Sequence, residues 1–184
     1  LVQWISSEKE KKVVAPTLFW SISLIASLLF FIYGYLRNDF AIMLGQFITY
    51  YIYIRNLQLQ HQWNKIKKGM RIFLLAFPLL AISISLYNEV FDFERLVDKQ
   101  FISSWLLFLG VFSQLLFTFR FVYQWVVSEK KKVSTLPIFF WMISILGASL
   151  ILIYAILRKD PILFMGQIFG LVVYIRNLMI LKRH

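Results

Sequence analysis

Long apolar stretches separated by short polar clusters run along the whole sequence. Each stretch is close to the ~20 residues that an α-helix needs to cross the hydrocarbon of a bilayer. The six stretches are 17–36, 40–59, 70–90, 101–126, 136–157 and 161–181. Prolines mark several of the starts (Pro16, Pro137 and Pro161), where a missing backbone N–H costs a helix nothing. The pattern predicts an all-α integral membrane protein with six spans in this chain.

The composition supports a membrane environment. Hydrophobic residues make up 60 % of the 184 residues, aromatic residues 18 % and charged residues only 16 %, and the mean hydropathy is +0.70. A soluble domain of this size needs a larger polar shell. The net charge of +11 favours loops beside a membrane over nucleic-acid binding. The chain has no cysteine, and its two histidines lack a second ligand at metal-binding spacing. We therefore expect no metal and no cofactor.

The positive charges predict the orientation of the spans. If the sides of the membrane alternate along the chain, 14 of the 20 Lys and Arg residues fall on one side and five on the other. The remaining residue, Arg120, lies within the span 101–126 and is counted on neither side. Because loops rich in Lys and Arg stay in the cytoplasm, the lysine-rich loops and the C-terminus are predicted to be cytoplasmic.

The sequence contains an internal repeat. Residues 2–59 align with residues 123–180 without a gap, and 24 of the 58 pairs are identical. The matches include Gln3 with Gln124, the Ser-Glu-Lys step at 7–9 and 128–130, and the run Ile-Arg-Asn-Leu at 54–57 and 175–178. Apolar composition alone does not produce so many identities, so we interpret the repeat as a duplication.

The spacing of the repeats predicts how they insert. Both Ser-Glu-Lys loops are expected on the cytoplasmic side, so an even number of spans separates them. The unrepeated helix at 70–90 supplies the odd crossing that keeps two three-helix units parallel. This three-plus-one-plus-three layout gives a first repeat at 1–60, a linker at 61–100 and a second repeat at 101–184. No stretch precedes Leu1 to match residues 101–121, so we expect a truncated first repeat; the alternative is a natural six-span protein.

Five phrases carry a resemblance to a known family: RFVYQWVVSEKKK, PIFFW, LRKDP, MGQIFG and YIRNL. Together they resemble the lipid-A-disaccharide synthase N-terminal domain family, a three-helix membrane module, over residues 102–181 and again over 2–59. This family is similar in fold to SWEET, SemiSWEET and PQ-loop proteins. The resemblance implies the bacterial inner membrane. It also implies that the catalytic glycosyltransferase part of such synthases is missing, so we expect the chain not to be an enzyme.

Arg120 is the most informative candidate residue. It lies four positions before Gln124, which places both on one helix face. A charge at membrane depth is costly and normally faces a cavity, a partner or a headgroup. A guanidinium suits bidentate binding of phosphate, so we favour a substrate or lipid-phosphate site. The alternatives are a structural pair and an arginine that snorkels to the interface.

Both repeats carry a polar stripe on their last helix. Its members are Gln167, Gly170, Tyr174 and Asn177 in the second repeat and Gln46, Thr49, Tyr53 and Asn56 in the first. Two matched stripes fit two half-sites that face one cavity. The alternative is hydrogen bonding between helices, with Gly166 and Gly170 allowing close approach.

Other repeated residues have less specific interpretations. Trp20 and Trp141 can stack on a sugar or belong to the interfacial aromatic belt. Glu8 and Glu129 are expected to form solvated ion pairs or to lock their loops. Cations at the cytoplasmic ends of the spans are candidates for binding lipid headgroups. These are Arg55, Arg176, Lys130, Lys67 and Lys68.

The residues favour a transporter or flippase-like carrier for a sugar or lipid-linked sugar. It would work by alternating access between the two repeats. The alternative is a non-catalytic accessory subunit that binds a glycolipid or isoprenoid phosphate for a separate membrane glycosyltransferase. A third alternative is a scaffold without a ligand. The expected partners are membrane lipids, the lipid-linked sugar and that glycosyltransferase.

Overall fold

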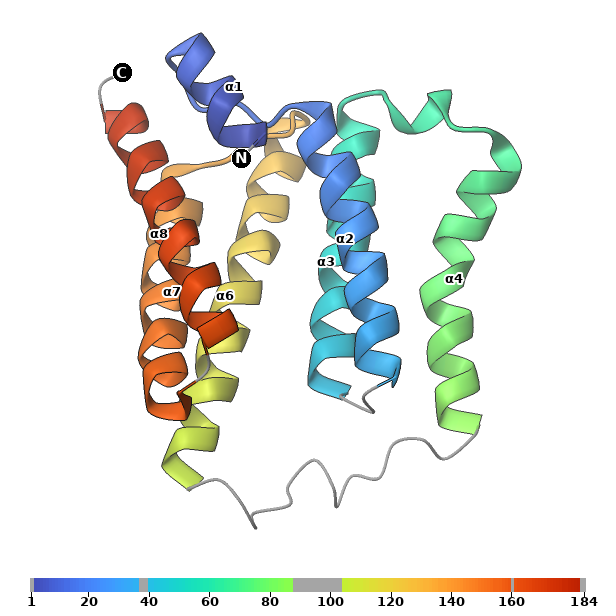
Figure 1. The fold of residues 1–184 in the computed structure, drawn as a ribbon. Coiled ribbons are helices and arrows are strands. Elements are labelled where there is room, and N and C mark those ends of the chain that lie inside the picture. The colour runs from blue at the N-terminus through green and yellow to red at the C-terminus, as the bar shows by residue number, and fades with distance from the viewer. Residues whose placement is uncertain (1, 37–39, 88–103, 160, 183–184) are drawn as a thin grey trace. The chain divides into compact units, whose positions relative to one another are not determined.

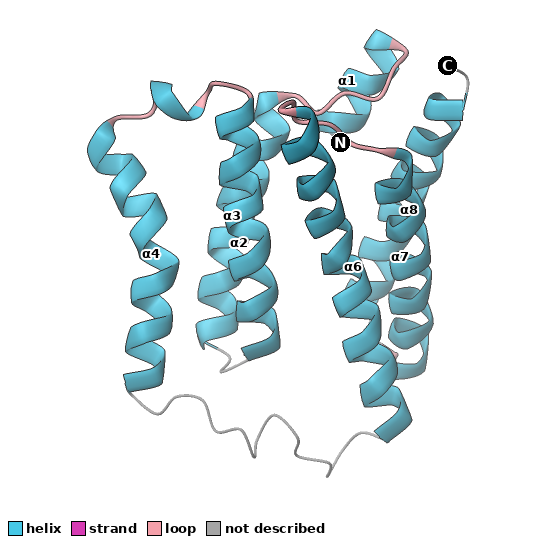
Figure 2. Ribbon diagram, turned by 180° about the vertical axis from the view of Figure 1, so that it is seen from behind, coloured by secondary structure: helices cyan, strands magenta, loops and turns pink. Residues whose placement is uncertain are grey.

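The computed structural model describes residues 2–36, 40–87, 104–159 and 161–182. In these ranges every regular element is a helix (Figure 2), which confirms the all-α prediction. The α-helices are α1 (Val2–Glu10), α2 (Thr17–Leu36), α3 (Phe40–Leu59), α4 (Lys68–Tyr87), α6 (Ser104–Lys131), α7 (Ile138–Arg158) and α8 (Pro161–Lys182), with a short 3-10 helix at Trp63–Lys65. The predicted ends at 88–90 and 101–103 lie outside the described residues.

Helix α6 continues beyond its predicted end at residue 126. The added residues Val127 to Lys131 are polar or charged in part but contain no proline or glycine, so the helix extends past its apolar segment. It ends at Lys132, which adopts a left-handed backbone with φ 54°. Lys11, its partner in the repeat, ends α1 with φ 53°. Helix α1 is therefore the counterpart of the last turns of α6.

The same polar contacts hold the chain after both helices. Gln3 Nε2 lies 2.8 Å from Ser7 Oγ, and the Ser7 hydroxyl accepts a hydrogen bond from the Val14 amide at 3.1 Å. In the second repeat Gln124 Nε2 lies 2.8 Å from Ser128 Oγ, which accepts from the Thr135 amide at 3.0 Å. The repeated Gln and Ser thus fold the lysine-rich loop back onto its own helix.

The chain divides into two compact units, one made of residues 1–16 and 101–184 and the other of residues 17–100. The predicted boundaries at 1–60, 61–100 and 101–184 describe the duplication of the sequence and stay a prediction. In the first unit α6 packs on α7, and α7 packs on α8 (Figure 1). A Cβ added at Gly147 of α7 would lie 3.3 Å from the Phe117 Cα of α6, so glycine permits this close contact.

In the second unit α2 packs on α3, and α4 is bound through tyrosines. Pro78 lies inside α4 and has no N–H to donate to the Leu74 carbonyl, four residues earlier. The hydroxyl of Tyr50 on α3 donates to that carbonyl at 2.7 Å, and Tyr51 donates to the Leu75 carbonyl at 2.8 Å. The Tyr50 hydroxyl therefore satisfies the carbonyl that the proline leaves without a donor.

Two of the described helices are long and apolar enough to cross a membrane, at Ile138–Arg158 and Leu163–Lys182, and a shorter apolar helix covers Thr17–Tyr33. Large apolar side chains are also exposed on the other long helices, among them Phe108, which is 70 % exposed, and Leu80, which is 60 % exposed. Such surfaces avoid water. These features indicate association with a membrane.

Candidate functional site

A buried arginine lies among aromatic rings of three helices in the first unit. Arg120 of α6 is only 7 % exposed. Its Cζ lies 3.5 Å from the ring centroid of Phe117, 5.5 Å from that of Phe140 and 5.1 Å from that of Tyr174. We call this group the arginine cluster; it comprises Phe117, Arg120, Phe121, Phe140, Trp141, Ser144 and Tyr174. The rings favour the cation through their electron-rich faces.

The hydrogen bonding of Arg120 is incomplete. Arg120 Nη1 donates to Ser144 Oγ at 3.2 Å, and the Ser144 hydroxyl donates to the Phe140 carbonyl at 2.6 Å. Arg120 Nε is buried and has no partner. None of the ion pairs among the described residues involves Arg120. A buried donor without a partner costs about 1–3 kcal/mol, so the cluster holds unused capacity to bind an acceptor.

A tryptophan and a tyrosine form the same pair in both repeats. The rings of Trp141 and Tyr174 are 6.1 Å apart at 43°, and those of Trp20 and Tyr53 are 5.9 Å apart at 40°. Both indoles are buried, and neither Nε1 atom has a hydrogen-bond partner. Tryptophans of an interfacial belt expose their N–H to polar surroundings, whereas these two are enclosed. Their role in stacking on a sugar stays a prediction.

Gln124 lies on the same helix as Arg120, one turn later, but its amide is used differently. Gln124 Nε2 donates to the Thr135 carbonyl at 2.9 Å as well as contacting Ser128. These bonds bring the lysine-rich loop to α6. Arg120 donates to Ser144, so these hydrogen bonds do not join Arg120 to Gln124. That both side chains bind one ligand stays a prediction.

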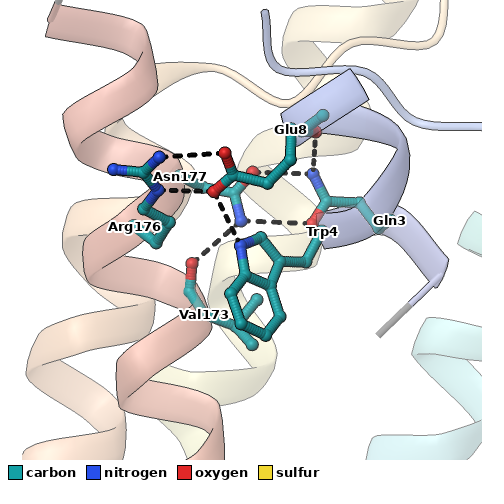
Figure 3. A network of polar contacts seen from close by, with 7 residues as sticks. Gln3, Trp4, Glu8, Val173, Arg176 and Asn177 are labelled. Carbon is teal, nitrogen blue, oxygen red and sulfur yellow. Dashed lines mark hydrogen bonds and ion pairs between the residues drawn. The ribbon is translucent and has the colours of Figure 1, made fainter. Parts of the chain in front are cut away.

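Helix α1 is bound to the end of α8 by a network of polar side chains (Figure 3). Gln3 and Asn177 exchange amide hydrogen bonds: Gln3 Nε2 donates to Asn177 Oδ1 at 2.8 Å, and Asn177 Nδ2 donates to Gln3 Oε1 at 3.2 Å. Both side chains are buried. Asn177 also donates to the Val173 carbonyl at 2.8 Å, so both N–H groups of its amide are used.

The carboxylate of Glu8 completes this α1–α8 network. Arg176 Nη2 donates to Glu8 Oε2 at 2.9 Å, and Arg176 Nε donates to Glu8 Oε1, which also accepts from Trp4 Nε1 at 3.0 Å. The guanidinium is thus held in two-point contact, the geometry that favours arginine over lysine. A lipid headgroup at Arg176 would have to share it with Glu8. Sequence analysis missed this network; the repetition of its members was the only available signal.

The remaining predicted residues lie at several places. In the first repeat Asn56 is buried and donates to the Ile52 carbonyl at 2.9 Å, as Asn177 does to the corresponding carbonyl. Arg55 Nη1 donates to Gln58 Oε1 at 2.9 Å. The other predicted residues are half-buried amides or exposed lysines. Gln46 and Gln167 are half-buried, and Lys67, Lys68 and Lys130 are exposed. None of their predicted roles is tested by these positions.

In the described part of the chain, the atoms nearest to a Cβ added at Gly166 or Gly170 do not belong to another helix. A Cβ added at Gly166 would meet nothing within 4 Å. At Gly170 it would meet the Tyr174 hydroxyl of the same helix at 3.1 Å. The close approaches between helices in this unit lie instead at Gly147, against Phe117, and at Gly110, against Tyr154, and sequence analysis selected neither glycine.

The comparisons with known proteins agree on one family. The family described as Lipid A Biosynthesis N-terminal domain matches residues 1–58 and 109–179, which together make up more than half of the chain. Lipid-A-disaccharide synthase of Chlamydia abortus is 28 % identical over 99 % of this chain, and that of Chlamydia pneumoniae is 28 % identical over 96 %. The chain spans about 30 % of the length of each of these relatives.

One sequence-based expectation needs correction. We expected a protein that is not an enzyme, but the relatives that match nearly the whole chain are named as synthases, so that expectation is wrong. No solved structure matches the chain. The predicted resemblance to the lipid-A-disaccharide synthase N-terminal domain is confirmed in both repeats. This chain belongs to the Lipid A Biosynthesis N-terminal domain family.

Proposed function

We propose that this protein is a multi-pass module of the bacterial inner membrane that binds a lipid-linked sugar of lipid A biosynthesis and carries it across or within the bilayer. The name of the relatives, lipid-A-disaccharide synthase, supports a sugar attached to lipid as the ligand. The lysine-rich loops and the C-terminus lie in the cytoplasm in this proposal, following the excess of positive charge on that side.

Arg120 is the observation that carries the proposal. A guanidinium that is 7 % exposed, stacked on Phe117 and without an ion pair among the described residues, is expensive to maintain beside apolar helices. Packing alone does not require a cation here, because a methionine or leucine fills a similar volume. A ligand with negative charge would offset this cost when it binds.

The arrangement that we propose is SWEET-like, with two parallel three-helix repeats joined by one helix. Its support is the repetition of local geometry: Trp141–Tyr174 and Trp20–Tyr53 have nearly equal separations, and Lys11 and Lys132 share a left-handed backbone. Repeats of equal structure can exchange roles when a carrier alternates between its inward and outward states.

The length of the relatives favours a second candidate function. This chain covers only about 30 % of the length of each relative, so the relatives are about three times longer. A membrane module within a synthase can hold the lipid-linked sugar at the bilayer surface for the reaction that forms the disaccharide. In this function binding at Arg120 is required, but movement across the bilayer is not.

Liposomes that contain the purified protein test the proposal. We expect the protein to accelerate exchange of a fluorescent lipid-linked sugar between leaflets, and Arg120→Met to reduce this rate at least tenfold. Arg158→Met is the matched control, because Arg158 is exposed at the end of α7, and it should retain the rate of the parent protein. Binding without exchange would favour the second function. Absence of both would overturn the proposal.

A further inference from the structure

We infer that the arginine cluster is a phosphate site in which the Trp141 indole N–H is a second donor beside the Arg120 guanidinium. This inference rests on the proposed function, because it names the part of the lipid-linked ligand that the cluster binds. Arg120 Nε and Trp141 Nε1 are both buried, and both lack a partner. Two unsatisfied donors in one cluster point to a missing acceptor.

The two donors belong to the same enclosure. The Phe140 ring centroid is 5.0 Å from that of Trp141 and 5.5 Å from Arg120 Cζ. Tyr174 likewise lies 6.1 Å from Trp141 and 5.1 Å from Arg120 Cζ. The same two rings therefore contact the guanidinium and the indole. Both donor nitrogens are buried beside these rings.

The donor set selects the chemical class of the ligand. Guanidinium and indole nitrogens only donate, whereas a sugar hydroxyl must both donate and accept to be satisfied. Ser144 Oγ already accepts from Arg120 and donates to the Phe140 carbonyl. An acceptor that carries negative charge fits this set, and a phosphate ester supplies terminal oxygens in more directions than a carboxylate does.

The aromatic neighbours fix the orientation of the guanidinium. Arg120 Cζ lies 3.5 Å from the Phe117 ring centroid, so one face of the group is covered and its edge, which bears the N–H groups, stays available for hydrogen bonds. Ser144 holds Nη1 at 3.2 Å. Ser144 is therefore a positioning residue, and its loss should weaken binding less than the loss of the Arg120 charge.

NMR of the 15N-labelled protein in detergent micelles tests this site. The probes are dodecyl phosphate, dodecanoate, dodecanol and inorganic phosphate. Trp141→Phe, which keeps an aromatic ring, identifies the Trp141 indole resonance by its disappearance. Trp125→Phe is the matched control, because Trp125 is 39 % exposed on the same unit and lies outside the cluster. Ser144→Ala reports on positioning.

We expect dodecyl phosphate to shift the Trp141 indole resonance downfield and dodecanol to leave it in place. Trp141→Phe should weaken the affinity for dodecyl phosphate about tenfold, and Trp125→Phe should leave it unchanged. Inorganic phosphate distinguishes the sources: an equal effect of inorganic phosphate would show that the site takes free phosphate, while the effect of dodecyl phosphate alone would show a lipid phosphate. Either result supports a phosphate site.

The outcome that overturns the inference is binding of dodecyl phosphate without a change at the Trp141 indole, or an equal response to dodecanoate. Failure of the proposed function has a different signature. In that case the liposomes show neither binding nor exchange of lipid-linked sugar, whatever happens at the indole. A phosphate site can thus be wrong while the carrier is right, and the reverse also holds.

Discussion

Gln3 and Asn177 are separated by 174 positions in the sequence, and each satisfies the amide of the other. Both are buried, at 4 % and 0 % exposure. Sequence analysis selected Asn177 as a member of the polar stripe on the last helix of the second repeat. It could not identify Gln3 as its partner, because an amide has many equivalent acceptors and a repeat pattern does not say which copy a helix packs against.

The costs of removing the two amides should therefore not add. Asn177→Leu leaves the buried Gln3 amide with fewer partners, and we expect a loss of about 1–3 kcal/mol in the free energy of unfolding. The double variant Gln3→Leu/Asn177→Leu should lose less than the sum of the two single variants. Titration with sodium dodecyl sulfate, followed by circular dichroism, measures each value. Additive losses would show that the two amides are not coupled.

At the scale of helices, periodicity and length predict most of the fold. The predicted bounds of α2 and α3 are those observed, and α7 and α8 agree to within two residues. The predictions failed where the apolar pattern stops being informative. Helix α6 runs on through Ser128 and Glu129, and Val2–Glu10 is helical although it is polar in part. Hydrophobicity predicts which residues lie in the membrane, but it does not predict where a helix ends. The helical hydrogen bonds of the backbone continue until a residue such as Lys132, with its left-handed backbone, ends the helix.

Gly147 lies where α7 approaches the backbone of α6. A Cβ at Gly147 would lie within 3.2–3.3 Å of Phe117, including its backbone. Gly147→Ala should therefore destabilise the protein by about 1 kcal/mol or more, because overpacking outweighs the better helix propensity of alanine. Gly166→Ala is the matched control, since its Cβ would meet nothing within 4 Å, and it should be neutral or stabilising by up to ~1 kcal/mol.

The measurement for this pair is the temperature at which each variant loses its helical circular dichroism in detergent. Gly147→Ala should unfold below the parent protein, and Gly166→Ala at or above it. Equal behaviour of the two variants would mean that the contact between Gly147 and Phe117 does not limit packing. It would also leave no physical reason why Gly147, rather than the predicted Gly166, lies at a close contact between helices.

At the scale of the whole molecule, duplication connects the candidate site to the proposed movement. The Trp–Tyr pair and the loop locked by Gln and Ser occur once in each repeat. The buried arginine lies in the second repeat. A carrier built from such repeats requires them to insert in the same direction, since only parallel copies present equivalent faces to one ligand.

The direction of insertion can be tested because the chain contains no cysteine, so every introduced cysteine is unique. Lys12→Cys reports the exposed loop that follows α1, and Lys131→Cys reports the exposed end of α6. Arg158→Cys reports the exposed end of α7. We expect an impermeant maleimide to label the first two only in inverted membrane vesicles and the third only in right-side-out vesicles. The physical reason is that Lys12 and Lys131 lie on the side with the excess of Lys and Arg, which is predicted to be cytoplasmic. Labelling of Lys12→Cys and Lys131→Cys from opposite sides would make the repeats antiparallel, and a carrier with two parallel half-sites would then be impossible.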